Sequence, residues 1–88
     1  MHPIRLADKL AQIRETWSPR IVAELNGQHV KLTKLHGEFV WHSHEREDEL
    51  FLVLAGRLRI ELRDGALELG PGEMAVIPRG VEPKPVAA

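Results

Sequence analysis

The residues best suited to chemistry in this 88-residue chain are two histidines, His42 and His44, and one glutamate, Glu49. Side chains at positions i and i+2 of a strand lie on the same face, so the two imidazoles would project side by side. Neutral imidazoles are common metal ligands. A short turn after His44 would bring the Glu49 carboxylate back as a third ligand. Two imidazoles and one carboxylate suit Fe(II), Mn, Zn, Ni or Cu.

A His-x-His pair is a weak signal by itself, because short patterns of this kind usually arise by chance on exposed strands. The context of the pair makes it specific. The spacing resembles the first motif of the cupin superfamily: Gly37, four residues, His42-Ser43-His44, four residues, Glu49, six residues, Gly56. The family usually has five residues after the first glycine, where this chain has four.

The second cupin motif is present in part. In the family it consists of a glycine, five residues, Pro-x-Gly, two residues, a histidine, three residues and an asparagine. Gly72, Pro78 and Gly80 match this spacing, but Pro83 stands at the histidine position and Ala87 at the asparagine position. The resemblance covers the chain from about residue 21 to its end.

The resemblance implies an all-β fold, the cupin double-stranded β-helix or jelly roll, with the metal ligands pointing into the barrel. The resemblance is to small single-domain cupins of the conserved-barrel, mannose-6-phosphate-isomerase-like type. Cupins include dioxygenases, isomerases and decarboxylases as well as modules that bind sugars and other small molecules. The fold therefore does not determine the function.

Two hypotheses follow for the function. In the first, His42, His44 and Glu49 bind one divalent metal ion (Fe, Mn, Zn or Ni), with open positions for a small-molecule ligand or substrate. His36 could lie near such a site, although a plain surface histidine is the commoner case. Whether the domain is an enzyme stays open, and no catalytic residue is identified. In the alternative, Pro83 marks a metal-free small-molecule or sugar-binding module, or a degenerate non-catalytic cupin.

Composition narrows the class of protein. The net charge is −1 with acidic and basic residues interspersed, which argues against nucleic acid and against a polybasic membrane surface. The chain has no cysteine, so disulfides and thiolate metal sites are excluded. The longest aliphatic run, residues 50–55, is too short to span a bilayer, and residues 1–10 have no hydrophobic signal core. We expect a cytoplasmic protein.

The first part of the chain predicts one short helix. Leu6, Leu10, Ile13 and Trp17 recur at helical spacing, and Pro19 disfavours helix in the residue before it. We expect an N-terminal helical extension over residues 1–19 and the cupin barrel over residues 20–88.

From residue 20 onward the pattern changes to short strands separated by turns, which is typical of a sandwich or barrel. Expected strands cover residues 21–25, 28–35, 38–44, 50–54, 57–63, 66–69 and 74–77. Expected turns lie at Asn26-Gly27, Asp64-Gly65, Gly70-Pro71-Gly72 and Pro78-Arg79-Gly80. Residues 50–54 are apolar on both faces, so we expect that strand to be fully buried.

The sequence also predicts a homodimer. Phe39 and Trp41 would lie on the outer face of the strand that carries the histidines, and two aromatic side chains there need a cover. We expect a second subunit or the amphipathic helix to supply it. Small cupins commonly dimerise through such sheets. Cupins of this kind usually have another strand after the segment that matches residues 81–88, so we also expect an unpaired sheet edge.

Overall fold

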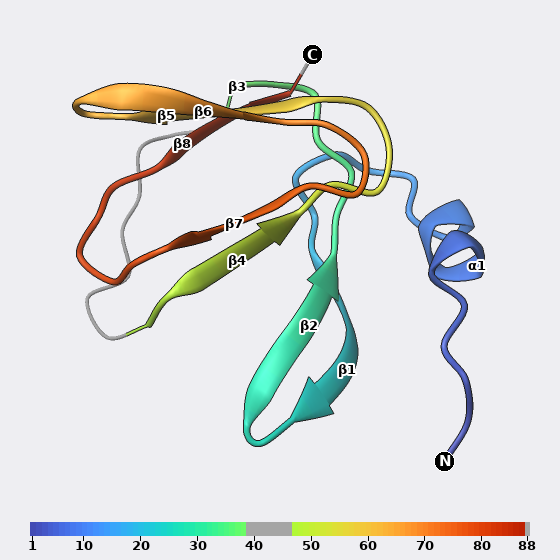
Figure 1. Ribbon diagram of the computed structural model, residues 1–88. Coiled ribbons are helices and arrows are strands. Elements are labelled where there is room, and N and C mark those ends of the chain that lie inside the picture. The colour runs from blue at the N-terminus through green and yellow to red at the C-terminus, as the bar shows by residue number, and fades with distance from the viewer. Residues whose placement is uncertain (39–46, 88) are drawn as a thin grey trace. The chain divides into compact units, whose positions relative to one another are not determined.

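The structure is a computed structural model, and it describes residues 1–38 and 47–87. The chain divides into two compact units, Met1–Leu35 and His36–Ala88. The first unit contains α1 (Leu6–Ala11), β1 (Arg20–Leu25) and β2 (Gln28–Leu32) (Figure 1). The described strands of the second unit are β3 (Gly37–Glu38), β4 (Glu49–Leu52), β5 (Leu58–Leu62), β6 (Gly65–Leu69), β7 (Met74–Ile77) and β8 (Lys84–Ala87).

The helix α1 is shorter than the apolar periodicity predicts, because it ends at Ala11. Beyond it, Trp17 has a positive φ of 57°, outside the helical region, and its backbone N donates a hydrogen bond of 2.8 Å to the Lys34 carbonyl. The Lys34 ammonium in turn donates to the Ile13 carbonyl at 2.7 Å. Pairing with Lys34 therefore replaces the last turns of a helix that would be marginal alone.

The predicted hairpin at Asn26-Gly27 is confirmed. Both residues have positive φ, 50° and 75°, as a type I′ turn requires. Leu25 and Gln28 form the pair that closes the loop between β1 and β2. Asparagine and glycine adopt this conformation at lower cost than other residues, so the local sequence determines where the hairpin turns.

The described strands of the second unit form two antiparallel sheets. One contains four strands in the order β3-β8-β5-β6, and the other contains β4 and β7. In Figure 1, β4 and β7 lie beneath β5, β6 and β8. At one end, the loops after β4 and β6 are joined by a pair of hydrogen bonds, Val53 N to Glu73 O at 3.0 Å and Gly72 N to Val53 O at 2.8 Å.

The core of this unit lies on one face of β5. Leu58 and Ile60 are 6% and 0% exposed, whereas Arg59 between them is exposed, as the two-residue period of a strand requires. Across the sheet, Leu58 pairs with Ala87 and Ile60 pairs with Pro85, both of which are buried. The apolar layer is therefore made of cross-strand pairs from β5 and β8.

The expectation of a fully buried strand over residues 50–54 is wrong. In β4, Leu50 and Leu52 are 57% and 49% exposed, while Glu49 and Phe51 are half-buried. A continuous apolar run does not show which of its faces packs against another layer. In the structure, the face that carries Glu49 and Phe51 is the more buried one.

The second hairpin turns one residue earlier than predicted. Its loop is Arg63-Asp64, because Gly65 already pairs with Leu62 as the first residue of β6. This register sets Ile60 opposite Leu67 and Leu58 opposite Leu69. Apolar side chains are thereby matched on one face, and that matching, more than the Asp-Gly pair, determines the register.

The predicted turn at Gly70-Pro71-Gly72 is confirmed. Gly72 has a φ of 80°, which a type II turn requires at its third position, and Glu73 N donates to Gly70 O at 3.0 Å. The Glu73 carboxylate also accepts a hydrogen bond of 2.6 Å from Gly70 N. Backbone and side chain together fix the connection between β6 and β7.

Several predictions about the boundaries and partners of the chain stay predictions. The division between an extension over residues 1–19 and a barrel over residues 20–88 is one of them. Phe39 and Trp41 lie outside the described residues, so the expectation that a second subunit or the amphipathic helix covers them also stays a prediction.

The last strand, β8, is not an edge, since β3 and β5 pair with its two sides. Within residues 1–38 and 47–87, no helix is long and apolar enough to cross a membrane.

The asymmetry between the two faces leads to a stability prediction. Ile60→Ala should lower the free energy of unfolding by about 2–5 kcal/mol, because it opens a cavity at a fully buried position. Leu50→Ala should lower it by less than about 1 kcal/mol, because that side chain is more than half exposed. Urea denaturation midpoints of the two variants measure the difference. Equal losses would contradict the assignment of the faces.

Candidate metal site

Glu49 is the predicted metal ligand that the structure describes. It is the first residue of β4 and pairs with Ile77, the last residue of β7. It lies on the same face as Phe51 and the buried Val53, and its Oε2 atom is buried. Residues i and i+2 of a strand share a face, so the carboxylate projects on the side of β4 that packs toward the core. The backbone thus holds one carboxylate oxygen inside the unit.

Pro83, at the position of the family's fourth ligand, is fully buried. It comes immediately before β8, and burial alternates along this segment, with Pro83, Pro85 and Ala87 buried and Lys84 and Val86 half-buried. Pro83 therefore projects to the same buried side of the sheet as Ile60. A proline ring offers no donor atom to a metal, so this position supplies packing and no ligand.

The segment from β7 to Pro83 is held beside Glu49 by Asp48. The Asp48 Oδ1 atom accepts a hydrogen bond of 2.9 Å from Arg79 N. Arg79 lies in a tight turn in which Val81 N donates to Pro78 O at 3.2 Å and Gly80 has a φ of 83°. Because Asp48 directly precedes β4, its side chain adds one bond beyond the β4–β7 ladder.

The role of Asp48 was missed from the sequence. Asp48 is exposed, but its carboxylate is bonded to the backbone. An aspartate one residue before a strand is a weak sequence signal. Its partner here is 31 residues away, so local patterns could not identify it.

The other predicted ligands, His42 and His44, lie outside the described residues. Within the described part of the chain, no three or more His, Cys, Asp or Glu side chains are grouped closely enough to hold a metal ion. The metal site formed by His42, His44 and Glu49 therefore stays a prediction. His36, which could have lain near the site, is exposed.

Arginines on the outward face of β5 and just beyond it are paired with carboxylates. Arg63 Nη2 lies 2.9 Å from Glu82 Oε2, and Arg59 Nε lies 3.9 Å from Glu61 Oε1. This pairing is typical of a solvated sheet face. Such exposed pairs contribute little to stability.

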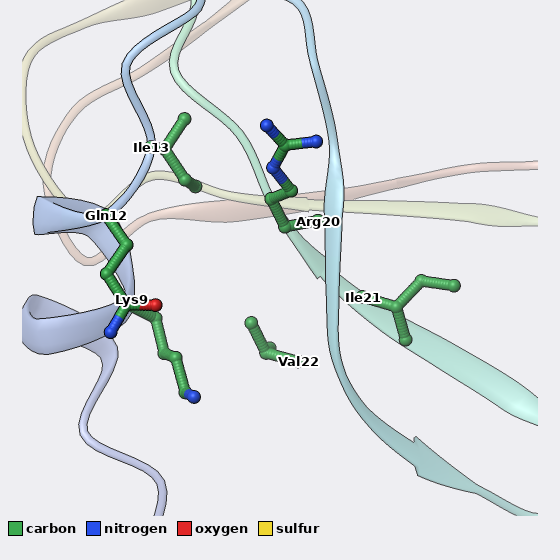
Figure 2. A pocket seen from close by; sticks show the side chains of 6 residues that line it. All are labelled: Lys9, Gln12, Ile13, Arg20, Ile21 and Val22. Atoms are coloured by element: carbon green, nitrogen blue, oxygen red, sulfur yellow. The ribbon is translucent and has the colours of Figure 1, made fainter.

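The first unit contains a separate cavity of about 270 Å³. It is lined by Lys9, Gln12, Ile13, Arg20, Ile21 and Val22 (Figure 2). Figure 2 shows the ammonium of Lys9 and the guanidinium of Arg20 on opposite sides of Val22. The lining has two cationic side chains and no carboxylate or imidazole, so it offers no set of metal ligands.

Comparison with known proteins agrees with this architecture. The Cupin_2 family, described as a cupin domain, matches residues 22–86. The uncharacterized protein YdbB of Bacillus subtilis strain 168 is 34% identical over 70 residues, which are 78% of this chain. The chain spans 62% of the length of YdbB.

Two crystal structures are also similar to the chain. A cupin-2 domain containing protein from Shewanella frigidimarina NCIMB 400 has 50% identity and a TM-score of 0.93, covering 96% of this chain and 82% of that one. Protein NMB1881 from Neisseria meningitidis has 33% identity and a TM-score of 0.89, covering 98% and 88%. The protein therefore belongs to the cupin family and has an all-β cupin jelly-roll fold with a short N-terminal helix.

Proposed function

We propose that this cupin domain binds one divalent metal ion through His42, His44 and Glu49, and that the ion binds a small molecule. The histidine spacing comes from the sequence. The structural observation that carries the proposal is the buried Oε2 atom of Glu49, on the core-facing side of β4. Carboxylate oxygens are among the ligands that divalent metal ions accept, and this one lies on the side of β4 that packs toward the core.

The donor set fits a mononuclear site with open positions. Two imidazoles and one carboxylate leave coordination sites for water or an exogenous ligand, and the buried Pro83 adds no further donor. A bound divalent ion would supply a Lewis acid and, with a redox-active metal, access to oxygen chemistry. Whether the domain catalyses a reaction depends on groups beyond these three side chains.

A metal-free module is the second candidate, and Pro83 is the observation that favours it. In place of the family's fourth ligand, the chain has an apolar ring packed in its core. In such a module His42 and His44 would contribute hydrogen bonds to a small polar ligand.

We also propose that the domain is related to mannose-6-phosphate-isomerase-like cupins, assembles as a homodimer and lies in the cytoplasm. The metal experiments test none of these three proposals.

The first experiment measures metal content. Protein purified without chelator and without a nickel column should contain about one equivalent of divalent metal per chain, or rebind it from Fe, Mn, Zn or Ni. His42→Ala should abolish this binding, because it removes one of three ligands. Plasma emission spectrometry provides the measurement.

His29→Ala is the matched control, because His29 is not a predicted ligand. His29 lies on β2, and its Nε2 atom is 3.2 Å from Glu24 Oε1. It should retain the metal of the wild type. Wild-type protein that neither contains nor rebinds any of the four metals would leave the metal-free module as the function.

Pro83→His tests the position of the fourth ligand. An added imidazole should tighten metal binding about tenfold or more, a change at least as large as that expected from outer-shell substitutions. Lys84→His is the control, because the adjacent side chain lies on the opposite face of the sheet. Competition against a chelating dye measures both affinities. Equal affinity in folded Pro83→His and wild-type protein would show that residue 83 does not face the site.

Asp48 gives a further prediction for the same site. Asp48→Ala removes the acceptor that holds the turn of Arg79, and metal affinity should fall several-fold because the backbone directly before Glu49 loses a bond that fixes its position. Asp48→Asn keeps a side-chain oxygen acceptor and should restore most of the affinity. Hydrogen exchange at the Arg79 amide should accelerate in Asp48→Ala alone. Slow exchange in that variant would contradict the role given to Asp48.

A further inference from the structure

The cavity of the first unit lies between the end of α1 and the start of β1. Its volume is about 270 Å³, and all of its lining residues belong to this unit. Pockets for drug-sized ligands usually measure roughly 300–1,000 Å³, so this one suits a smaller molecule. The cavity shares no residue with the proposed metal site.

The two walls of the cavity are held by Lys34. Its ammonium donates a hydrogen bond of 2.7 Å to the Ile13 carbonyl, and its own carbonyl accepts a bond of 2.8 Å from Trp17 N. Lys34 lies just beyond β2, which pairs with β1 from Arg20 and Leu32 onward. The segment after α1 and the start of β1 are therefore fixed to the same hairpin, and the cavity between them is a feature of the backbone.

The cavity has an aliphatic part. Arg20 and Val22 are two residues apart in β1 and so share a face. Figure 2 shows both side chains projecting toward the helical segment, whereas Ile21 between them projects away. Val22 is half-buried and Ile13, on the other wall, is 2% exposed. Methyl and methylene groups of a ligand would pack against these two side chains.

The polar part of the lining carries positive charge. The Lys9 ammonium and the Arg20 guanidinium come from opposite walls, and both side chains are exposed to an entering molecule (Figure 2). Within the described part of the chain, neither forms an ion pair. The lining contains no carboxylate, and Gln12 adds an amide that both donates and accepts hydrogen bonds. The complementary ligand is an anion.

The backbone at the end of α1 does not cancel this charge. Carbonyls at a helix C-terminus carry partial negative charge and disfavour anions when they are unpaired. Here Lys9 O accepts a hydrogen bond of 3.2 Å from Gln12 N, and Leu10 O accepts one of 3.1 Å from Ile13 N. The Ile13 carbonyl is bonded to the Lys34 ammonium. These carbonyls are thus engaged within the unit.

The charge of the whole first unit also favours an anion. Residues 1–35 contain six Lys and Arg and three Asp and Glu, whereas residues 36–88 contain six and ten. One of the three acids, Glu24, lies 3.2 Å from His29. A surface with an excess of one sign of charge raises the local concentration of ligands of the other sign.

We propose that this cavity binds a small aliphatic dicarboxylate, with one carboxylate at Lys9 and the other at Arg20. Two cations on opposite walls match a ligand with a charge at each end. The guanidinium receives its carboxylate through two parallel hydrogen bonds, and the ammonium acts as a point charge. The aliphatic middle of the ligand packs against Ile13 and Val22. This site does not depend on the proposed metal site.

NMR titrations of isotope-labelled wild-type protein with succinate, glutarate and adipate test the proposal. At least one of the three should shift the amide signals of residues 9–13 and 20–22 saturably, with a Kd of about 1 mM or lower. The half-amide of that dicarboxylate has nearly the same shape and one charge fewer. It should bind at least about tenfold more weakly, because one of the two charged contacts is lost.

Charge-removing variants locate the site. Lys9→Gln and Arg20→Gln should each weaken the binding at least about tenfold. Arg14→Gln is the matched control, because Arg14 is an exposed cation of the same unit that does not line the cavity. It should change the Kd less than about twofold. Circular dichroism spectra confirm that the variants are folded.

His42→Ala separates this site from the proposed metal site. It removes a proposed metal ligand and should leave dicarboxylate binding unchanged. Loss of binding in His42→Ala would assign the ligand to the metal site and overturn the proposal.

Three further results would also overturn it. The first is the absence of saturable shifts with all three dicarboxylates up to about 20 mM. The second is equal affinity for the dicarboxylate and its half-amide. The third is an equal loss in Arg14→Gln, Lys9→Gln and Arg20→Gln, which would show that only the net charge of the unit acts.

Discussion

The apolar layer on the buried side of β5 and β8 is the constraint on which the rest of the second unit depends. Ile60 at its centre is fully buried and pairs with Pro85, and Leu58 pairs with Ala87. This matching sets the register of β5 with β6 and β8, and the alternation along each strand then sends charged residues to the outer face. Because the layer has so little polar surface, a charged group that reaches the interior needs a compensating partner.

Among the described residues, Glu49 places a charged group in this apolar interior. Its place at the start of β4 puts one carboxylate oxygen inside the unit, next to Phe51 on the same face. Asp48, one residue earlier, bonds to the backbone of the turn that leads to Pro83. Glu49 thus places a carboxylate oxygen in the interior, whereas the exposed Asp48 joins the start of β4 to the turn of Arg79.

The outward face of β4 and β7 has a different character. Leu50 pairs with Val76 and Leu52 with Met74, and all four are about half exposed or more. Together they form a contiguous apolar surface, whereas an isolated exposed leucine would be ordinary. Apolar surfaces of this kind are where proteins associate. The same strand therefore carries an acid on one face and exposed apolar side chains on the other.

The sequence by itself determined the features that depend on local chemistry. Asn26-Gly27 and Gly70-Pro71-Gly72 turn where their backbone preferences require, and apolar and charged residues alternate along residues 58–62, with Leu58 and Ile60 on the buried face of β5. The spacing around His42 and Glu49 was sufficient to recognise the cupin family, and the fold followed from that resemblance. The ligand set itself remains a prediction.

Only the tertiary structure decided the features that depend on distant partners. The helix ends at Ala11 because Lys34 takes over the backbone of the following residues, and nothing in the helical periodicity records that competition. The exposed side of β4 could not be read from an apolar run, since burial depends on which layer packs against it. The bond from Asp48 to Arg79 joins residues 31 apart, and only folding brings them together.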